Sequence, residues 1–146
     1  WSNLIAQIKE KINPVLHKCL NSSKNAIEED ESFYRDELAS IQKNGEERDV
    51  QREQTCPGSD GRIDLLVDNE VWELKAKQAC GQDVYQCLFY IDTADSNVKQ
   101  ETARLIAPSF SDGAYRTVKI LEEKRNVKVK LKTFADVGLS GKVKQD

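Results

Sequence analysis

Two short apolar runs with high β-propensity, at residues 63–67 and 71–76, constrain this chain more than any other feature. Asp68 and Asn69 lie between them, and both residue types accept the positive φ values of a two-residue type I′ turn. Two runs of this length joined by such a turn are typical of a β-hairpin. We therefore predict a tight hairpin over residues 61–77, although its strands carry charged residues in their middles.

The charged residues of this hairpin are predicted to share one face. Counting back from the turn places Asp64 opposite Glu73, and strand alternation puts Lys75 on the same side. Directly opposed residues have Cβ atoms about 4.5–5.5 Å apart, so two carboxylates there repel each other unless a cation lies between them. A hard divalent cation such as Mg²⁺ prefers oxygen ligands of this kind. The alternative is a solvent-exposed face with Lys75 in a surface ion pair, although Leu66 and Val71 on that face argue against full exposure.

The composition narrows the class of protein. The 146 residues fit one domain, and 38% hydrophobic with 32% charged residues is typical of a soluble globular protein. No apolar run approaches the roughly 20 residues that cross a bilayer, so we expect no membrane partner. The chain has one histidine and four cysteines without a C-x-x-C pair, which argues against a zinc site. We expect the cysteines to be free thiols and the protein to be intracellular, either cytoplasmic or nuclear. Because the chain opens at Trp1 and contains no methionine, we expect a domain of a longer protein whose other domains are absent.

Hydrophobic periodicity predicts helices and strands on both sides of the hairpin. Helices are expected at about 2–20, 26–43, 82–93 and from a capping box at Ser109 and Asp112 to about 124, and strands near 49–54, 103–107 and 126–134. The resulting order, α-α-β-β-β-α-β-α-β, predicts an α/β fold with a mixed central sheet flanked by helices. Residues 1–23 are expected to form an N-terminal helical arm, and residues 24–146 the main domain.

Two of these helices carry polar residues in unusual places. Glu31 falls inside the apolar stripe of the helix at 26–43, where a charge needs a partner unless it reaches out from the edge of the stripe. Gln82, Gln86 and Tyr90 form a polar row at i, i+4 and i+8 on the helix that follows Lys75. This row can reach a substrate near the hairpin, or it is ordinary solvent surface.

The segments GRIDLLV and VWELKAK, followed by QCLFY, resemble the motifs of the PD-(D/E)XK nuclease superfamily, in particular its RecB-like and Holliday-junction-resolvase-like branches. The likeness covers about residues 27–132. It implies the restriction-endonuclease-like α-β-β-β-α-β core and hydrolysis of phosphodiester bonds with Mg²⁺ or Mn²⁺. Ile63 stands where the motif name has proline, a departure that many members share.

The resemblance assigns roles residue by residue. It implies that Asp64 and Glu73, with the backbone carbonyl of Leu74, bind the metal, and that Lys75 assists the attacking water. The remaining assignments are Gln86 as an accessory active-site residue, Glu31 as the acid of the first core helix and Tyr90 as a supporting aromatic residue.

Nucleic acid is then the expected partner, with DNA favoured over RNA, and a homodimer is a further expectation from the family. Residues 115–146 carry nine Lys or Arg against four Asp or Glu, a balance that suits phosphate or simply a solvated face. Candidate contacts to nucleic acid are Lys77, Gln82, Tyr90, Lys128 and Lys130. The lysines at 128–132 have an alternative role, because lysines protect an exposed edge strand from aggregation.

Two other functions stay open on the sequence alone. One is a nucleic-acid-binding module on a nuclease-like scaffold that is inactive or activated by a partner. The other is a nuclease toxin domain that acts on RNA. Metal-independent, salt-sensitive binding without cleavage would distinguish the first of them, and cleavage of RNA would identify the second.

Overall fold

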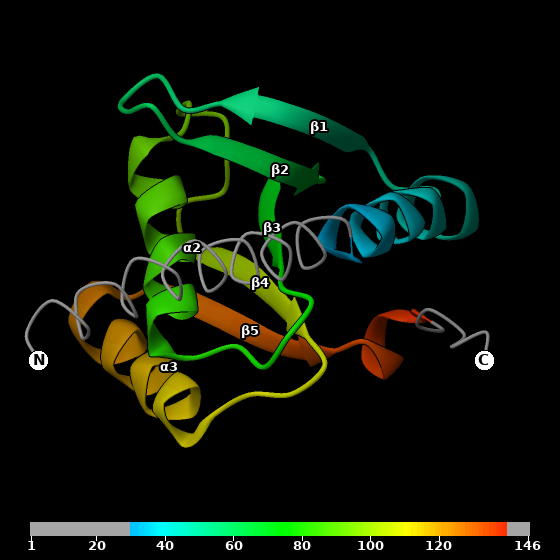
Figure 1. Ribbon diagram of the computed structural model, residues 1–146. Helices are drawn as coiled ribbons and strands as arrows, with labels where there is room; N and C mark the ends of the chain where they lie inside the picture. Colours follow the sequence, from blue (N-terminus) through cyan, green and yellow to red (C-terminus); the bar gives the residue numbers. More distant parts are fainter. Residues whose placement is uncertain (1–29, 140–146) are drawn as a thin grey trace, which may run out of the picture.

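Residues 30–139 are described by the computed structural model and contain one five-stranded sheet (Figure 1). The strands are β1 (Val50–Thr55), β2 (Arg62–Val67), β3 (Glu70–Leu74), β4 (Thr102–Ala107) and β5 (Lys128–Thr133). They follow the spatial order β1-β2-β3-β4-β5, with the first two pairs antiparallel and the last two parallel. The prediction of an α/β fold with a mixed sheet is therefore confirmed. The predicted arm at 1–23 lies outside the described residues.

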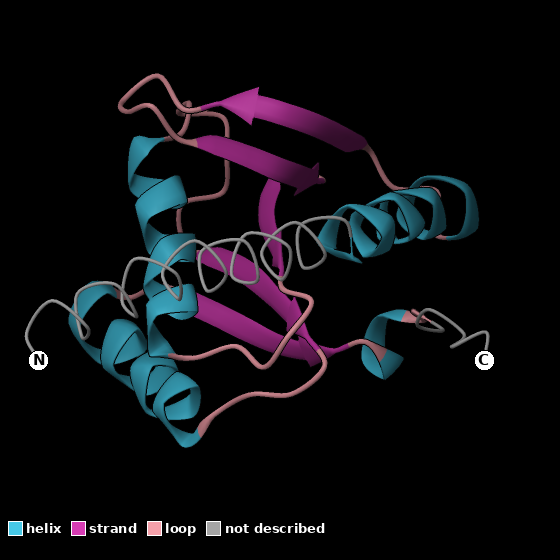
Figure 2. Ribbon diagram, viewed as in Figure 1, coloured by secondary structure: helices cyan, strands magenta, loops and turns pink. Residues whose placement is uncertain are grey.

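Helices cover both faces of this sheet (Figure 2). The chain is helical over residues 30–40 and continues through a π-helical turn, Ile41–Gly45. The helices α2 (Gly81–Thr93) and α3 (Asp112–Arg125) pack together on the opposite face, and a short 3₁₀ turn, Ala135–Val137, follows β5. A helical crossover is the usual connection between parallel neighbours, here β3–α2–β4 and β4–α3–β5.

The two faces of the sheet build two separate cores. The first core lies under α2 and α3 and includes Leu66, Val71, Leu105 and Val129. The second core lies under the helix of residues 30–40, and its members include Leu38, Leu65, Trp72, Leu74 and Ile106. Alternate residues of each strand enter opposite cores, as the pleat of a strand requires. Burying each large apolar side chain stabilises the fold by about 1.5–3 kcal/mol.

The hairpin between β2 and β3 has the predicted turn and register. Asp68 and Asn69 have φ values of 50° and 63°, the left-handed pair that a type I′ turn requires. Leu65 pairs with Trp72, and Leu66 with Val71. The second strand is shorter than predicted: β3 ends at Leu74, although the N–H of the next residue still donates to the Ile106 carbonyl at 2.8 Å.

The caps of α2 and α3 differ from the sequence prediction. Ser111, not Ser109, is the N-cap of α3, and its hydroxyl accepts the Ala114 N–H at 3.2 Å. Ser109 instead extends the preceding segment, because its carbonyl accepts the Ala79 N–H at 3.0 Å. Spacing alone favoured the earlier serine, but the hydrogen bond between two distant segments holds it outside the helix.

The start of α2 lies very close to α3. A Cβ atom added at Gly81 would lie 2.5 Å from the Thr117 hydroxyl oxygen, well inside van der Waals contact. That hydroxyl is itself held by a 2.7 Å hydrogen bond to the Gly113 carbonyl. Glycine at position 81 therefore allows the first turn of α2 to approach α3 and fixes where this turn lies beneath the sheet.

Candidate active site

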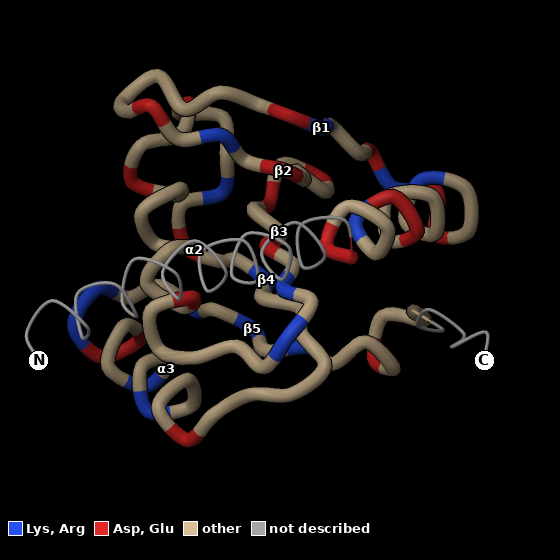
Figure 3. Tube along the Cα trace, viewed as in Figure 1, with Lys and Arg blue, Asp and Glu red and all other residues tan. Residues whose placement is uncertain are grey.

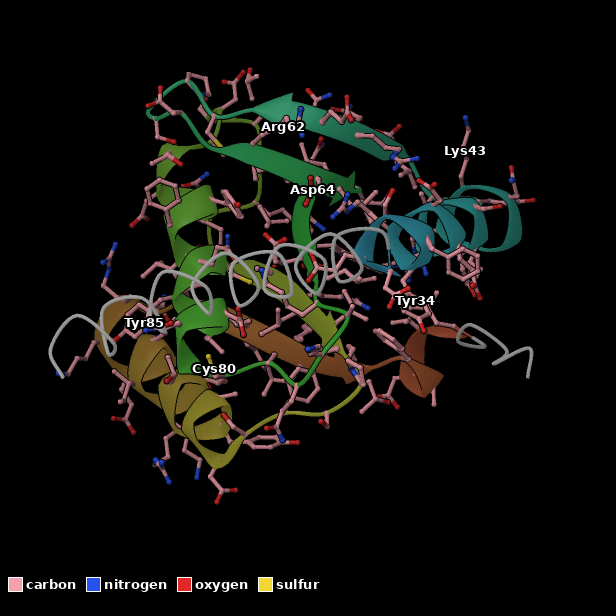
Figure 4. All side chains as sticks on the ribbon, in the orientation of Figure 1. Tyr34, Lys43, Arg62, Asp64, Cys80 and Tyr85 are labelled. Atoms are coloured by element: carbon pink, nitrogen blue, oxygen red, sulfur yellow. The ribbon has the colours of Figure 1, made fainter. Side chains whose placement is uncertain are left out.

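The charged residues of the hairpin lie where β2 and β3 separate. The last paired residues of the ladder are Leu65 and Trp72, and continuing the same register by one step places Asp64 across from Glu73. The Glu73 side chain points to the face of the sheet that carries the first core, because its neighbours Trp72 and Leu74 belong to the second core. Asp64 forms an ion pair with Arg35 of the helix of residues 30–40. Figure 4 shows Asp64 on β2, near the helix of residues 30–40.

Glu73 is the most deeply buried acid of this site, with 4% of its surface exposed. Burial raises the pKa of Glu73 to about 8, because the charged form loses its hydration. Lys75 and Arg35 counteract this rise, while the negative charges of Asp64 and Glu31 add to it. Glu73 is therefore largely protonated at neutral pH, and four charged side chains lie close enough to act on it.

Arg35 lies between two acids of the site. Its Nη2 atom is 3.5 Å from Asp64 Oδ2 and 4.0 Å from Glu31 Oε2. Its Nε atom is buried without a hydrogen-bond partner among residues 30–139. The guanidinium thus supplies positive charge to the acidic site without closing tight hydrogen bonds to it. Figure 3 shows acidic and basic positions intermixed where this helix meets β2 and β3.

Sequence reasoning missed Arg35, although a signal for it existed. Arg35 follows Glu31 by four residues, so both lie on one face of the helix. Glu31 itself lies where the prediction placed it, because its Oε1 accepts the Ala76 N–H at 3.4 Å, just past the end of β3. An arginine one turn after a functional acid, on the same face, was therefore a further candidate.

Asp83, which lies beside Lys75, is a second residue that the sequence analysis did not select. Its Nζ atom lies 3.8 Å from Oδ1 of Asp83, in the first turn of α2. The other oxygen of Asp83 accepts the Cys80 N–H at 2.8 Å and so caps the helix. The signal for Asp83 was its place in the first turn of the helix, three residues after the N-cap Cys80. The cap fixes the carboxylate, which in turn holds the lysine beside the sheet.

Gln86 and Tyr90 lie one turn apart on α2, as predicted, and contact each other. The Gln86 amide donates to the Tyr90 hydroxyl oxygen at 3.1 Å. Burial, followed by the negative charge of Glu73, raises the pKa of Tyr90 to about 12. Burial likewise raises the pKa of the neighbouring Cys87 thiol. The polar row of α2 therefore reaches the acids of the hairpin, except for Gln82, which is exposed in the first turn.

The predicted nucleic-acid contacts are not gathered at one place. Lys77 is exposed in the segment after β3. Lys128 and Lys130 are on β5, two strands from β3, and their register with Arg104 and Thr102 places them on the opposite face from Glu73. Lys128 is exposed and Lys130 partly buried on this edge strand. Of the five candidates, Tyr90 is the one that the structure brings beside the acids.

The donor set of this site fits a hard cation. Asp64, Glu73 and Glu31 supply carboxylate oxygens, and the Leu74 carbonyl lies between Glu73 and Lys75 in the chain. Among residues 30–139, no three His, Cys, Asp or Glu side chains are arranged closely enough to hold a metal by themselves. Two carboxylates, one carbonyl and water molecules would satisfy Mg²⁺, which keeps several waters. The loose contact with Arg35 leaves Asp64 available for such a ligand role.

Comparisons with protein-family models, with curated proteins and with solved structures gave no match for this chain. Within residues 30–139, no helix combines the length and the apolar character that a membrane span requires. Fold and site together define the chain as an α/β protein with a mixed, open five-stranded sheet. One end of its third strand carries a cluster of ionisable residues.

Proposed function

We propose that this protein is a divalent-metal-dependent nuclease of the PD-(D/E)XK type that hydrolyses phosphodiester bonds, with DNA favoured over RNA. The observation that carries this proposal is the buried acid Glu73, its pKa raised to about 8, next to Asp64 and Lys75 at the separation of β2 and β3. Strong pKa perturbation by burial and by specific charged neighbours is typical of catalytic sites.

The arrangement of elements supports the same proposal. A helix, three antiparallel strands, a helix and a parallel strand follow one another from residue 30 to β4, the order expected for the restriction-endonuclease-like core. The motif residues Glu31, Gln86 and Tyr90 come from two different helices and lie near the same pair of acids. This proximity of residues from separate segments supports the proposal.

The residues of the site have distinct chemical tasks in this proposal. Asp64 and Glu73, with the Leu74 carbonyl, would hold Mg²⁺ or Mn²⁺, and the bound ion polarises phosphate and lowers the pKa of its water. Glu73 must release its proton before it acts as a ligand, because a metal binds the ionised carboxylate. Lys75, held by Asp83 at 3.8 Å, orients the attacking water and stabilises charge on the phosphoryl oxygens.

Gln86 and Tyr90 would support the substrate side of the site. The Tyr90 hydroxyl oxygen accepts a hydrogen bond from the Gln86 amide. Tyr90 keeps its own proton, because its pKa is raised to about 12. This proton is available to a phosphate oxygen, and the Gln86 carbonyl oxygen is available to a water molecule. Both groups are held on a rigid helix, which favours a defined geometry for the reaction.

A cleavage panel tests the proposal. Linear, nicked, flap and four-way DNA, together with RNA, are incubated with Mg²⁺, Mn²⁺ or EDTA. We expect cleavage of at least one DNA substrate that depends on the metal and falls at least about a hundredfold in Lys75→Met. Lys43→Met, an exposed lysine outside the candidate site and the candidate contacts to nucleic acid, is the matched control and retains cleavage. Equal cleavage by Lys75→Met and the intact protein would exclude the assigned role of the lysine.

A nucleic-acid-binding module without catalytic activity is the second candidate. The observation that favours it is Arg35, whose guanidinium lies between Glu31 and Asp64 and supplies the positive charge that a metal would otherwise bring. In this case binding would be independent of metal and would weaken steeply with salt, and no substrate of the panel would be cut. Preferential cleavage of RNA in the same panel would point instead to a ribonuclease, including a toxin domain.

A further inference from the structure

A polar cavity opens on the face of the sheet opposite Glu73. It has a volume of about 410 Å³, and its lining includes Gln42, Glu46, Arg48, Trp72, Arg104 and Asp136. Trp72 and Arg104 are neighbours in the β3–β4 register and point away from Glu73, because successive strand residues alternate between faces. The cavity is therefore separate from the candidate active site.

Trp72 forms one wall of this cavity, and two arginine side chains lie against its ring. Its side chain is 1% exposed, and its indole N–H donates to Glu70 Oε1 at 2.9 Å. The guanidinium carbons of Arg104 and Arg48 lie 4.7 Å and 5.8 Å from the centre of its ring. Both distances are typical of cation–π contacts. Two guanidinium groups are thus held in place at the edge of the cavity.

Arg104 is fixed by a well-partnered acid. Its Nε donates to Glu70 at 3.0 Å, and the Thr102 hydroxyl donates to the other oxygen of the same carboxylate at 2.5 Å. Burial alone would raise the pKa of Glu70, but these hydrogen bonds, with the charges of Arg104 and Lys130, lower it overall. Glu70 therefore stays ionised and orients Arg104, whose terminal nitrogens are not needed for this contact.

Among residues 30–139, one group of the cavity lacks a hydrogen-bond partner and another lacks an ionic partner. Gln42 is 5% exposed, and its side-chain carbonyl oxygen is buried with no hydrogen-bond donor among residues 30–139. Within the same residues, the guanidinium of Arg48 forms no ion pair. A buried acceptor without a donor is unfavourable, so such a group can mark a place where another molecule binds.

We propose that this cavity binds a nucleotide. The phosphate would bind Arg48 and the free edge of Arg104, because guanidinium groups pair with phosphate through two parallel hydrogen bonds. An N–H of the base would donate to the Gln42 carbonyl oxygen, and the flat guanidinium of Arg48 offers a surface on which a base stacks. The volume lies within the range of about 300–1,000 Å³ common for small-ligand sites.

The acids of the lining restrict the charge of the ligand. Glu46 and Asp136 balance the two arginines, so the lining has no net charge to attract a chain of phosphates. Asp136 is held by the Thr133 N–H, which donates to it at 2.9 Å, and hydrogen bonds from Thr133 lower its pKa. Its free carboxylate positions accept hydrogen bonds from sugar hydroxyls. We therefore expect a nucleoside monophosphate, or the terminal nucleotide of a strand, rather than a triphosphate.

Calorimetric titration of the intact chain tests the site directly. The ligands are the four nucleoside monophosphates, ATP, adenosine, inorganic phosphate and a 5′-phosphorylated oligonucleotide, all without divalent metal so that cleavage plays no part. Arg48→Gln is expected to weaken monophosphate binding at least about tenfold. Arg116→Gln, an exposed arginine on α3, is the matched control and leaves binding unchanged. Arg104 is not substituted, because its loss would leave Glu70 buried and unpaired.

Two further variants separate the contributions of base and phosphate. Gln42→Met removes the buried carbonyl with little change in shape, so it should weaken a nucleotide about fivefold and leave inorganic phosphate unaffected. Trp1→Phe leaves Trp72 as the one indole of the chain, and its fluorescence should change on titration with the nucleotide. Thermal unfolding of every variant confirms that the fold is kept.

The outcomes decide the proposal. Tighter binding of the monophosphate than of the oligonucleotide identifies a free nucleotide, and the reverse identifies a strand terminus. The proposal is overturned if no ligand binds at millimolar concentration, if Arg48→Gln binds like the intact protein, or if inorganic phosphate binds as tightly as the nucleotide. These results are independent of nuclease activity, which depends on residues of the other face.

Discussion

Glu70 and Glu73 lie three residues apart on β3, with 6% and 4% of their surfaces exposed, and differ in protonation at neutral pH. Glu70 receives hydrogen bonds from Trp72 and Thr102 and pairs with Arg104, and its pKa is lowered. Glu73 is surrounded by acids as well as bases, and its pKa is raised to about 8. Similar surface exposure thus gives a structural anion on one face and a poised acid on the other. Loss of hydration dominates the pKa of Glu73, whereas hydrogen bonds and the charge of Arg104 outweigh it at Glu70.

The largest expected difference between the two glutamates is in catalysis. Glu73→Gln should reduce metal-dependent cleavage at least about a hundredfold, since an amide is a poor ligand for Mg²⁺ and carries no charge. Glu70→Gln should leave the rate within a few fold, measured well below its melting temperature, because this residue faces the other side of the sheet. Equal losses in the two variants would show that the division of roles between the two faces is wrong.

Stability should change in the opposite order. Glu70→Gln is expected to lower the free energy of unfolding by about 3 kcal/mol, because Arg104 loses its buried counter-ion and two hydrogen bonds weaken. Glu73→Gln should leave the metal-free protein at pH 8 as stable as the intact chain or more so, since it removes a carboxyl that is costly to ionise there. Urea unfolding at pH 8 with EDTA measures both values, and a more damaging Glu73→Gln would contradict the comparison.

The pH dependence of stability sharpens the same contrast. The pKa of Glu73 is about 8 in the folded chain against 4.5 for an ordinary glutamate, so between these values the folded state binds more protons. Its contribution to stability is complete below about pH 4.5 and is lost as pH rises through about 8, a loss of about 5 kcal/mol. Glu73→Gln should flatten this part of the curve of melting temperature against pH. A slope that persists in the variant would have another origin.

The smallest effect concerns Arg35, whose positive charge lowers the pKa of Glu73. Arg35→Met removes the positive charge between Glu31 and Asp64, so the affinity for Mn²⁺ should rise several-fold, on the scale of a partly exposed ion pair. Arg52→Met, which breaks an exposed pair with Asp36, is the control and should not alter metal affinity. Calorimetric titration with Mn²⁺ measures both, and a weaker affinity in Arg35→Met would show that the arginine supports the metal site instead.

Local spacing was enough to predict much of the fold. The φ preferences of Asp68 and Asn69 and the alternation of apolar residues determine the hairpin, and both were confirmed. The order of helices and strands from residue 30 onward followed from periodicity in the same way. The prediction failed where a distant segment decides, as at Ser109, whose backbone is tied to residue 79.

The candidate site was predictable to a similar extent. Motif spacing selected Glu31, Gln86 and Tyr90, and the structure places all three near the hairpin acids. It did not select Arg35 or Asp83, whose roles arise because a helix is packed against the end of β2 or β3. The cavity beside Trp72 was equally hidden, since its lining comes from four separated segments that meet only in the folded chain.

Because Gly81 lies close to Thr117, α3 helps to determine the position of candidate active-site residues that it does not itself contact. A Cβ atom at position 81 would lie too close to the Thr117 hydroxyl, so either this hydroxyl or the first turn of α2, which carries the carboxylate of Asp83, would have to move. If the turn moved, Lys75 would lose the group that restrains its ammonium, and in the proposed nuclease turnover would fall while substrate affinity stayed the same. In this way, a methyl group introduced between α2 and α3 would slow the proposed reaction, although α3 itself does not contact the candidate active site.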